Sequence, residues 1–468
     1  MVAHAQLRVG AGKVDITPDA KNFPEPFASI HDRLFTRAIL VENGNQSALL
    51  INLDTGKISK WLADETIDQI GAKYGIPRQN ILIAAVHDHA SVLNLGSVND
   101  AAHPERQTRE VAMRQLSPAM QAFINNAQEG MLRAVAEAEH ALQPAEVGFG
   151  EGKLYLNANR DAIDPKTRLW AQEPELEYPS DKALAVMVFR APHSGEPIAV
   201  FFNYAMHATS MFLREEISGD FPEAASQYIE SAYGDKVVAE WTIGAAGDQN
   251  PLYLRAIDAI GKTRQDQEMD PVNPGEDPSA ERFKAFVRLF NGPLHHPLQP
   301  MNPMLEKNSW QVVQAMGTIM AEEAMRVMGT IDMYSSDPTI EGLTATVACP
   351  RRGVPADSGK ASQATTADGP PVVIHVGALR IGTIALAYNN SELYTKIGLE
   401  IKAASPLRDT VVMGLVNGAG EYVPSDDVYG HGTFQVKDNL LKPGCAEMGV
   451  VKTLSSLLYR EMDQPAYK

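Results

Sequence analysis

The chain has 468 residues, of which 44% are hydrophobic, so it is long enough for one large or two ordinary globular domains with a sizeable core. Its 41 Lys and Arg residues against 58 Asp and Glu residues give a formal net charge of −17. This charge argues against nucleic acid as the main partner and against electrostatic adhesion to an anionic membrane surface.

The sequence also bears on compartment and on cysteine chemistry. No apolar run reaches the roughly 18 residues of a membrane-spanning helix, and no signal peptide is visible. Strand-like sequence begins at Leu7, so a processed or trimmed N-terminus is one explanation. The two cysteines, Cys349 and Cys445, have no paired spacing, which predicts two inert core thiols rather than a disulfide framework or a cysteine zinc site.

The first hundred residues predict strands and a helix in α/β order. Two apolar runs joined by an Asn-Gly-Asn turn at 43–45 predict a hairpin. An amphipathic helix is expected over 60–74, with Gly75 placed to end it. A buried strand over 81–86 follows. This order favours a sheet whose strand ends bring polar residues, Asp54 among them, to one rim.

The most informative stretch is ILIAAVHDHAS, at 81–91. Alternate side chains of a strand share a face, so His87 and His89 are expected to leave the strand end on one side. Neutral imidazole is a common metal ligand, and zinc accepts nitrogen. A pair of surface or capping histidines is the alternative. A second strand, over 198–204, leads to His207 in NYAMHATSM, and this repetition favours a metal site.

The rest of the chain alternates strands and helices, and no internal repeat is visible. Helices are expected over 115–141, 222–233 and 310–328, and strands over 146–150, 153–156, 184–190, 237–243, 372–376, 381–387 and 411–416. Residues 252–308 are irregular and charged, which predicts an insertion or lid near a binding face. Residues 355–371 are rich in small and polar residues and predict a mobile loop.

Several polar residues follow predicted strands. Asn159 and Arg160 lie just beyond one, where an arginine is by default a surface residue. Asp248 and Asn250 lie in the turn GAAGDQNP, which lacks the lysine and the spacing of a nucleotide-binding loop. Glu392 follows another strand in YNNSELYT.

The sequences of these motifs and their order along the chain resemble those of the neutral ceramidase family, the zinc-dependent amidases that split the N-acyl bond of ceramide. The matching pieces are GAGKVDIT, DRLFTRAILV, ILIAAVHDHAS, NYAMHATSM, SGDF, AAGDQNP, SELYT and GEYVPS, from about residue 7 to about 460. The resemblance implies a single α/β catalytic domain over 1–468 with a mixed β core, without room for the family's C-terminal immunoglobulin-like domain.

The resemblance implies four zinc ligands, His87, His207, Glu392 and Tyr422, and two residues that face the substrate, His89 and Arg160. A carboxylate is an ordinary zinc ligand, whereas a tyrosine is outside the usual set. Tyr422 therefore depends on the resemblance alone, and a core or substrate-binding phenol is its alternative.

One position departs from the family. The family carries a serine implicated in catalysis in a Gly-Asp-x-Ser-Pro piece, but 247–251 reads Gly-Asp-Gln-Asn-Pro. Asn250 stands in place of the serine, which excludes a serine nucleophile there and leaves Asn250 as a candidate catalytic residue. Asparagine is bulkier and offers a fixed amide instead of a rotatable hydroxyl, so long-chain ceramide is expected to be a poor substrate.

We therefore expect a zinc-dependent hydrolase of an amide bond that acts through metal-activated water. His89 is expected to transfer the proton, and Arg160 or Tyr422 to help stabilise the oxyanion. Asp54 and Asp88 are expected to orient the imidazoles. The expected partner is a small amide or ester, not nucleic acid, and the oligomeric state stays open. The alternatives are a zinc esterase or lactonase and a non-catalytic metal-binding homologue. The expected location is secreted or periplasmic, with a cytoplasmic one left open.

Overall fold

The computed structural model describes residues 6–19, 21, 23–24, 27–96, 108–163, 170–211, 216–253, 266–272, 281, 284–285, 303–353 and 368–463. Most of the predicted lid at 252–308 and of the predicted loop at 355–371 lies outside these ranges. Residues 303–308, the last part of the predicted lid, form the start of a long helix, so the predicted insertion extends too far toward the C-terminus. The assignment of 1–468 to one domain stays a prediction.

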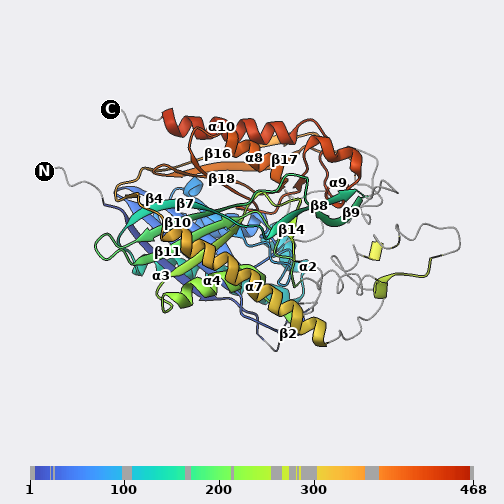
Figure 1. Ribbon diagram of the computed structural model, residues 1–468, viewed down its shortest axis with the longest axis horizontal. Coiled ribbons are helices and arrows are strands. Elements are labelled where there is room, and N and C mark those ends of the chain that lie inside the picture. Colours follow the sequence, from blue (N-terminus) through green and yellow to red (C-terminus); the bar gives the residue numbers. More distant parts are fainter. Residues whose placement is uncertain are drawn as a thin grey trace.

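One topological unit occurs three times along the chain. In each unit three antiparallel strands form a meander, a helix follows, and a fourth strand lies parallel to the third. A long helix then covers the outer face (Figure 1). The repetition is one of topology, and the expectation that the sequence has no internal repeat stays a prediction.

The bounds of the three units are as follows. The first contains β1 (Arg8–Asp15), β3 (Phe35–Asn43), β4 (Gln46–Leu53), α1 (Lys60–Tyr74), β5 (Ile81–Ala85) and α3 (Pro118–His140). The second contains β7 (Glu146–Lys153), β10 (Ala183–Arg190), β11 (Pro197–Tyr204), α4 (Asp220–Ala232), β13 (Val238–Ile243) and α7 (Pro303–Met328). The third contains β16 (Ile340–Cys349), β17 (Val372–Ile381), β18 (Ile384–Asn389), α8 (Thr395–Ala404), β20 (Asp409–Met413) and α10 (Ala446–Asp463).

Shorter elements complete the described fold. They include β2 (Ser29–Ile30), α2 (Arg109–Gln115), β6 (Gln143–Pro144), β8 (Asn157–Ile163), β9 (Trp170–Glu175), β12 (Glu216–Ile217), β14 (Gln249–Pro251), β15 (Tyr334–Ser335), β19 (Glu392–Leu393), β21 (Tyr422–Val423), α9 (Phe434–Asp438) and two 3-10 helices, η1 (Arg78–Asn80) and η4 (Asp426–His431). Two of them matter for the site: β14 pairs with β8, and β19 pairs in parallel with β21.

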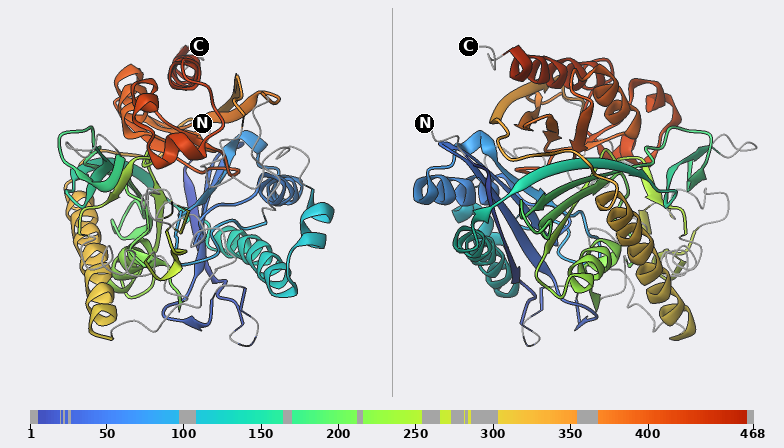
Figure 2. Two further views of the ribbon diagram at one scale, coloured as in Figure 1. Left: turned by 90° about the vertical axis from the view of Figure 1, so that its right-hand side faces the viewer. Right: turned by 60° about the vertical axis from the view of Figure 1, so that its left-hand side comes forward.

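The three sheets meet around a shared core, and helices cover their outer faces (Figure 2). Buried side chains from all three sheets form this core, among them Ile39, Leu50, Met187, Phe201, Leu379 and Leu386. Separate hydrophobic clusters join each sheet to its own helices: α1 and α3, α4 and α7, or α8 and α10. The predicted α/β class with a mixed β core is confirmed.

Local sequence signals explain several element ends. The hairpin turns at Gly44, whose φ is 62°, and α1 ends at Gly75, whose φ is 71°, both as predicted. The helix expected over 115–141 is α3, which begins at Pro118, and a separate helix, α2, ends at Gln115 just before it. The break precedes Pro118, which occupies the first turn of α3, and the Ser117 side chain accepts a hydrogen bond from the amide of Met120.

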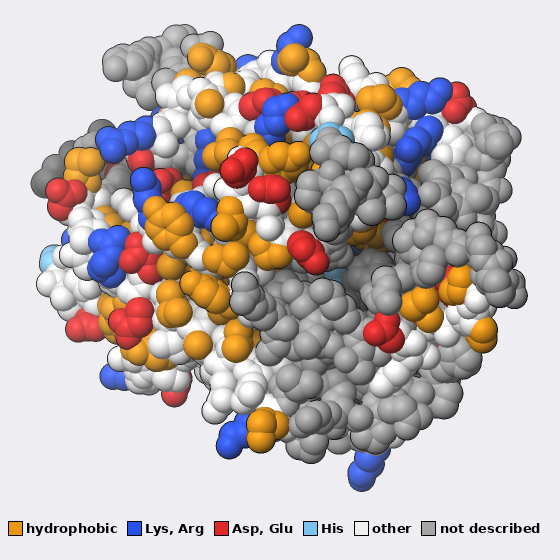
Figure 3. Space-filling model, turned by 45° about the vertical axis from the view of Figure 1, so that its right-hand side comes forward, with side chains coloured by type: hydrophobic (Ala, Val, Ile, Leu, Met, Phe, Trp, Pro, Cys, Tyr) orange, Lys and Arg blue, Asp and Glu red, His pale blue; other side chains and the backbone are white. Residues whose placement is uncertain are grey.

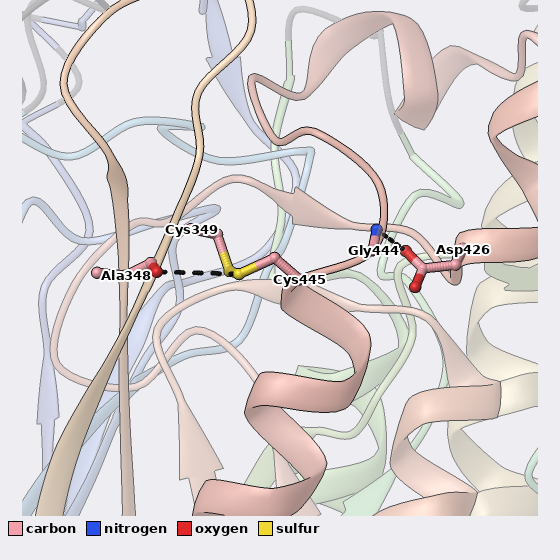
Figure 4. The surroundings of a disulfide bond; sticks show 5 residues. All are labelled: Ala348, Cys349, Asp426, Gly444 and Cys445. Carbon is pink, nitrogen blue, oxygen red and sulfur yellow. Dashed lines mark hydrogen bonds between the residues drawn. A yellow bond between two sulfur atoms is a disulfide. The ribbon is translucent and has the colours of Figure 1, made fainter.

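The two cysteines form a disulfide, so the expectation of two free thiols is wrong (Figure 4). Cys349 ends β16, and Cys445 immediately precedes α10, which packs on that sheet. The partners are 96 residues apart in sequence. Spacing alone could not reveal the pair, because the packing of α10 on its sheet brings the two ends together.

The surface carries mixed side chains. On the face in Figure 3, hydrophobic side chains form a patch interspersed with acidic and basic ones. Among the helices of the described residues, none is both long and apolar enough to cross a lipid bilayer.

Candidate metal centre

The candidate site lies where strand ends of all three units meet. The amide of Ala85 at the end of β5 donates to the carbonyl of Leu415, 3.2 Å away, and the amide of Gly414 donates to Ile243 at the end of β13, 3.0 Å away. These bonds join the first unit to the third and the third to the second. The polar residues just beyond the strands are therefore brought together.

His87 reaches the site by a turn rather than from a strand face. β5 ends at Ala85, and His87 has a left-handed backbone with φ of 63°. Its amide donates to the carbonyl of Thr55 over 2.9 Å, which helps to hold this unusual conformation. The alternating-face argument is thus wrong, although the imidazoles of His87 and His89 do meet, with their Nε2 atoms 3.2 Å apart.

Three imidazoles and a carboxylate converge in the protein interior. Ligand-type nitrogen atoms of His87, His89 and His207 all lie within 4.8 Å of one another. Oε2 of Glu392 is 3.1 Å from Nε2 of His87 and 3.1 Å from Nε2 of His207. An ion about 2.0–2.1 Å from two ligands in tetrahedral geometry separates them by about 3.3 Å, so this spacing suits a single zinc-sized ion.

The hydrogen bonds behind the imidazoles decide which nitrogen faces the centre. Nδ1 of His87 is 2.8 Å from the carbonyl of Gly56, and Nδ1 of His207 is 3.1 Å from the carbonyl of Gln249. A carbonyl oxygen only accepts, so each Nδ1 donates a hydrogen bond to it, and Nε2 is the nitrogen of each ring that is left to bind a metal. Two lone pairs and a carboxylate oxygen then face one another, and a cation would satisfy all three.

The electrostatics of the site keep His207 and His89 neutral. Burial, followed by the positive charge of Arg160, lowers the pKa of His207 to about 3. Burial and the neighbouring imidazoles also hold the pKa of His89 well below its usual range. Neutral imidazole is the form that binds metal.

The carboxylate of Glu392 is charged. Burial alone would raise its pKa, but the positive charge of Lys57 and the contacts with His87 and His207 bring that pKa well below its usual range. Nζ of Lys57 lies 2.5 Å from Oε1 of Glu392. Sequence reasoning missed Lys57. The segment DTGKISK shows only a lysine near a helix start, which is usually a solvated residue.

Arg160, Tyr422 and Asn250 form the polar wall beside this cluster. Nη2 of Arg160 is 3.3 Å from the Tyr422 hydroxyl, and Nη1 donates to Oδ1 of Asn250 over 3.2 Å. Arg160 is buried inside β8, not beyond a strand as expected, because β8 begins at Asn157. Tyr422 lies on β21 directly opposite Glu392. The structure therefore brings all the predicted site residues into one region.

The Gly-rich turn connects this wall to the carboxylate. The carbonyl of Gly247 accepts a hydrogen bond from Nη2 of Arg160 over 2.7 Å, and its amide donates to Leu393 over 2.8 Å. A Cβ at Gly247 would lie 2.6 Å from the carbonyl of Glu392, so only glycine permits this approach. Asp248 supports the same turn: its carboxylate accepts from the amide of Thr395 and from the side chain of Asn159.

The acidic residues expected to orient the imidazoles do not orient His87 or His207. Backbone carbonyls do so instead. Asp54 accepts from the amide of Phe35 and lies beside the buried Arg37, and Asp88 accepts from the amide of Ala90. The prediction is wrong for these two rings because the backbone carbonyls of Gly56 and Gln249 already accept from their Nδ1 atoms.

The fold and this cluster define an α/β protein with a candidate metal centre. Residues 8–271 match the family described as neutral/alkaline non-lysosomal ceramidase, N-terminal, and this match spans more than half of the chain. The chain belongs to that family.

Similar proteins agree with this assignment. The neutral ceramidase of Pseudomonas aeruginosa is 24% identical over 93% of this chain and 69% of that protein, and the neutral ceramidase of Mycobacterium tuberculosis is 26% identical over 49% of this chain and 36% of that protein. The crystal structure of the Pseudomonas enzyme covers 98% of this chain and 75% of its own, with a TM-score of 0.67 and 18% identity. A ceramidase complexed with C2 gives a TM-score of 0.68 and 17% identity over 98% of this chain and 76% of its own. At these identities the structural likeness establishes the fold.

Proposed function

We propose that the protein is a zinc-dependent hydrolase that cleaves an amide bond with metal-activated water. The observation that carries this proposal is the convergence of two Nε2 lone pairs, from His87 and His207, on Oε2 of Glu392. Buried acceptors that face one another without a donor are costly, and a bound cation removes that cost. Family membership supports an amide as the scissile bond.

His87, His207 and Glu392 would hold the ion, with Tyr422 as the fourth ligand that the family resemblance implies. His89 is the alternative third imidazole, since its nitrogen lies within the same cluster. A bound zinc ion would lower the pKa of a water molecule and polarise the substrate carbonyl.

The protein's own groups would complete the chemistry. His89 is neutral, and its Nε2 lies 3.2 Å from Nε2 of His87, so it is placed to accept a proton and to return it to the leaving nitrogen. Arg160, whose Nη2 donates to the Tyr422 hydroxyl, would stabilise negative charge on the carbonyl oxygen; the Tyr422 hydroxyl is the alternative donor if it does not bind the metal. Asn250 would hold Arg160 in place through its Oδ1 atom.

The substrate we propose is smaller or more polar than long-chain ceramide. A pocket beside Arg160 and Asn250 is lined in addition by the polar residues Asn159, Gln172 and Glu173 and by the apolar residues Ala158, Pro174 and Pro251, so its wall is mixed and not continuously apolar. A long acyl chain needs a continuous apolar wall, because burial of each methylene is worth about 0.8 kcal/mol. Polar groups at this wall forfeit part of that energy.

The location we propose is secreted or periplasmic. The Cys349–Cys445 disulfide supports this, because disulfides persist chiefly in oxidising compartments.

The test combines metal content with a substrate series. Purified protein is expected to carry one zinc per chain and to hydrolyse N-acyl amides of two to eighteen carbons, with a maximum of kcat/KM at short chains. Chelation should abolish turnover, and added zinc should restore it. Rates that climb steadily to long-chain ceramide would overturn the proposed substrate. Preference for matched esters or lactones would overturn the amide bond, and full turnover without metal would overturn the mechanism.

A further inference from the structure

The two oxygens of Glu392 have different partners. Oε2 faces the nitrogen atoms of His87 and His207, each 3.1 Å away. Oε1 faces the ammonium of Lys57, 2.5 Å away. The Glu392 side chain is 2% exposed, so little water competes with either contact. The two carboxylate oxygens are therefore not equivalent: Oε1 pairs with the lysine, and Oε2 faces the imidazoles.

Lys57, His207 and Glu392 occupy equivalent positions in the three topological units. His207 lies three residues beyond β11, Glu392 three residues beyond β18, and Lys57 four residues beyond β4. These three strands are equivalent, since each is the third strand of its unit and precedes that unit's helix. Each unit thus contributes one polar side chain from the same topological position, and the three side chains meet.

The backbone around Lys57 is tied to the site. The neighbouring carbonyl, of Gly56, accepts from Nδ1 of His87, and the carbonyl of Lys57 accepts from the amide of Leu95 over 2.8 Å. The segment that orients one candidate ligand therefore also places the lysine beside another. The ammonium is 5.6 Å from the ring centre of Tyr422, and the Lys57 side chain is 18% exposed.

We propose that Lys57 is a positioning residue that reserves Oε1 of Glu392, so that the carboxylate binds the metal through Oε2 alone. A carboxylate can bind a cation through one oxygen or through both. Binding through both would fill a position that a catalytic zinc site keeps open for water. Lys57 preserves that position. This inference rests on the metal site proposed above.

The variants Lys57→Met and Lys57→Arg test this role. Methionine is uncharged and releases Oε1, whereas arginine keeps the charge. The matched control is Lys402→Met, which removes a lysine that is 21% exposed and whose Nζ lies 2.7 Å from Oδ2 of Asp181, a carboxylate that is not a candidate ligand. Three quantities are measured for each protein: the zinc dissociation constant, the metal coordination number by X-ray absorption, and kcat and KM separately.

Lys57→Met is expected to bind zinc at least as tightly as the parent, because a repelling charge is lost and a second oxygen is freed. Its coordination shell should gain an oxygen from the carboxylate, and kcat should fall by about 10–100-fold with a smaller change in KM. Lys57→Arg should restore both the coordination number and most of kcat, and Lys402→Met should resemble the parent.

Other outcomes overturn the inference in distinct ways. Weaker zinc binding together with lower activity in Lys57→Met would indicate a merely structural role. An unchanged coordination number and unchanged kcat would show that Lys57 does not control the carboxylate. If the parent itself binds no metal, the proposed function fails together with this inference, whereas the first two results leave the proposed function intact.

Discussion

Two buried charged clusters in this protein have opposite hydrogen-bond arrangements. In the first, Arg37 donates from Nε to Glu230 over 2.8 Å and from Nη2 to Glu223 over 2.7 Å, and Lys13 donates to Glu230 over 2.6 Å. In the second, the imidazoles and the carboxylate of the candidate metal centre meet as acceptors. In the first cluster the guanidinium and ammonium groups donate to the carboxylates. In the second, Nε2 of His87 and Nε2 of His207 face Oε2 of Glu392, and Lys57 pairs with the other carboxylate oxygen, Oε1.

This difference teaches how to separate structural from functional buried charge. Burial by itself perturbs pKa values in both clusters. It raises the pKa of Glu223 to about 8 even though Arg37 opposes the shift, and it lowers the pKa of His207 to about 3. A shifted pKa therefore does not identify the site. The two clusters differ in geometry instead: Nε2 of His87 and Nε2 of His207 converge on Oε2 of Glu392, whereas Nε and Nη2 of Arg37 donate to Glu230 and Glu223.

The largest expected effect is on the structural cluster. Arg37→Met removes the donor shared by Glu223 and Glu230 and leaves only Lys13 to pair with Glu230, and removal of one partner from a buried ion pair costs about 3–5 kcal/mol. The free energy of unfolding, measured with denaturant, should fall by that amount, while zinc binding per folded molecule stays unchanged. A loss below about 1 kcal/mol would contradict the view that this cluster is held by its internal ion pairs.

The next effect concerns metal retention. His207→Ala removes one of the two rings that face Glu392. Zinc affinity should therefore fall by about 10–100-fold or more, and turnover should fall with it. The control is His140→Ala, at a surface histidine whose side chain is 83% exposed. Zinc at full occupancy with unchanged affinity in His207→Ala would place the metal elsewhere.

A pH effect is expected at the Gly-rich turn. Burial raises the pKa of Asp248 to about 7 from an ordinary value near 3.8. The folded protein therefore holds this proton more tightly than the unfolded chain. The resulting stability is fully present below about pH 4 and is lost as the pH rises through 7.

The variant Asp248→Asn should remove this pH dependence. The decline in unfolding free energy between pH 4 and pH 8 should become shallower by a few kcal/mol, since each pKa unit corresponds to about 1.4 kcal/mol. Asn159→Ala, which removes a neutral partner of the same carboxylate, is the control and should keep the decline. An equally steep decline in Asp248→Asn would contradict the assignment.

The smallest effect is expected at Asn250. If Asn250 only holds Arg160, Asn250→Ala should lower kcat/KM by about tenfold or less, which is the size expected for one neutral hydrogen bond, and should leave zinc content unchanged. Asn250→Ser should behave similarly. A complete loss of turnover with normal zinc would mean that Asn250 itself takes part in the reaction.

Residue patterns reveal parts of this molecule and hide others. His87 and His207 could be predicted because each follows a short apolar strand, and Gly75 because it ends an amphipathic helix. Glu392 and Tyr422 gain meaning only through family resemblance, since their pairing joins β19 to β21 across 30 residues.

Contacts between units escape prediction from sequence altogether. Arg37 lies in an apolar strand, and its partners Glu223 and Glu230 come from a helix in the second unit. Lys57 is distinguished only by its approach to Glu392 in the third unit. Within the third unit, the disulfide also joins residues that are 96 positions apart in sequence. Such contacts depend on how the three sheets and their helices pack, and periodicity within one segment carries no information about that packing.

The central claim is that one cation satisfies the converging acceptors of His87, His207 and Glu392. Anomalous diffraction at the zinc absorption edge, from crystals of zinc-loaded protein, tests it most directly. We predict a single strong peak within about 2.0–2.2 Å of Nε2 of His87, Nε2 of His207 and Oε2 of Glu392, with Oε1 still beside Lys57. A folded, zinc-treated protein with no peak at this position, or with the peak at other residues, would contradict the account.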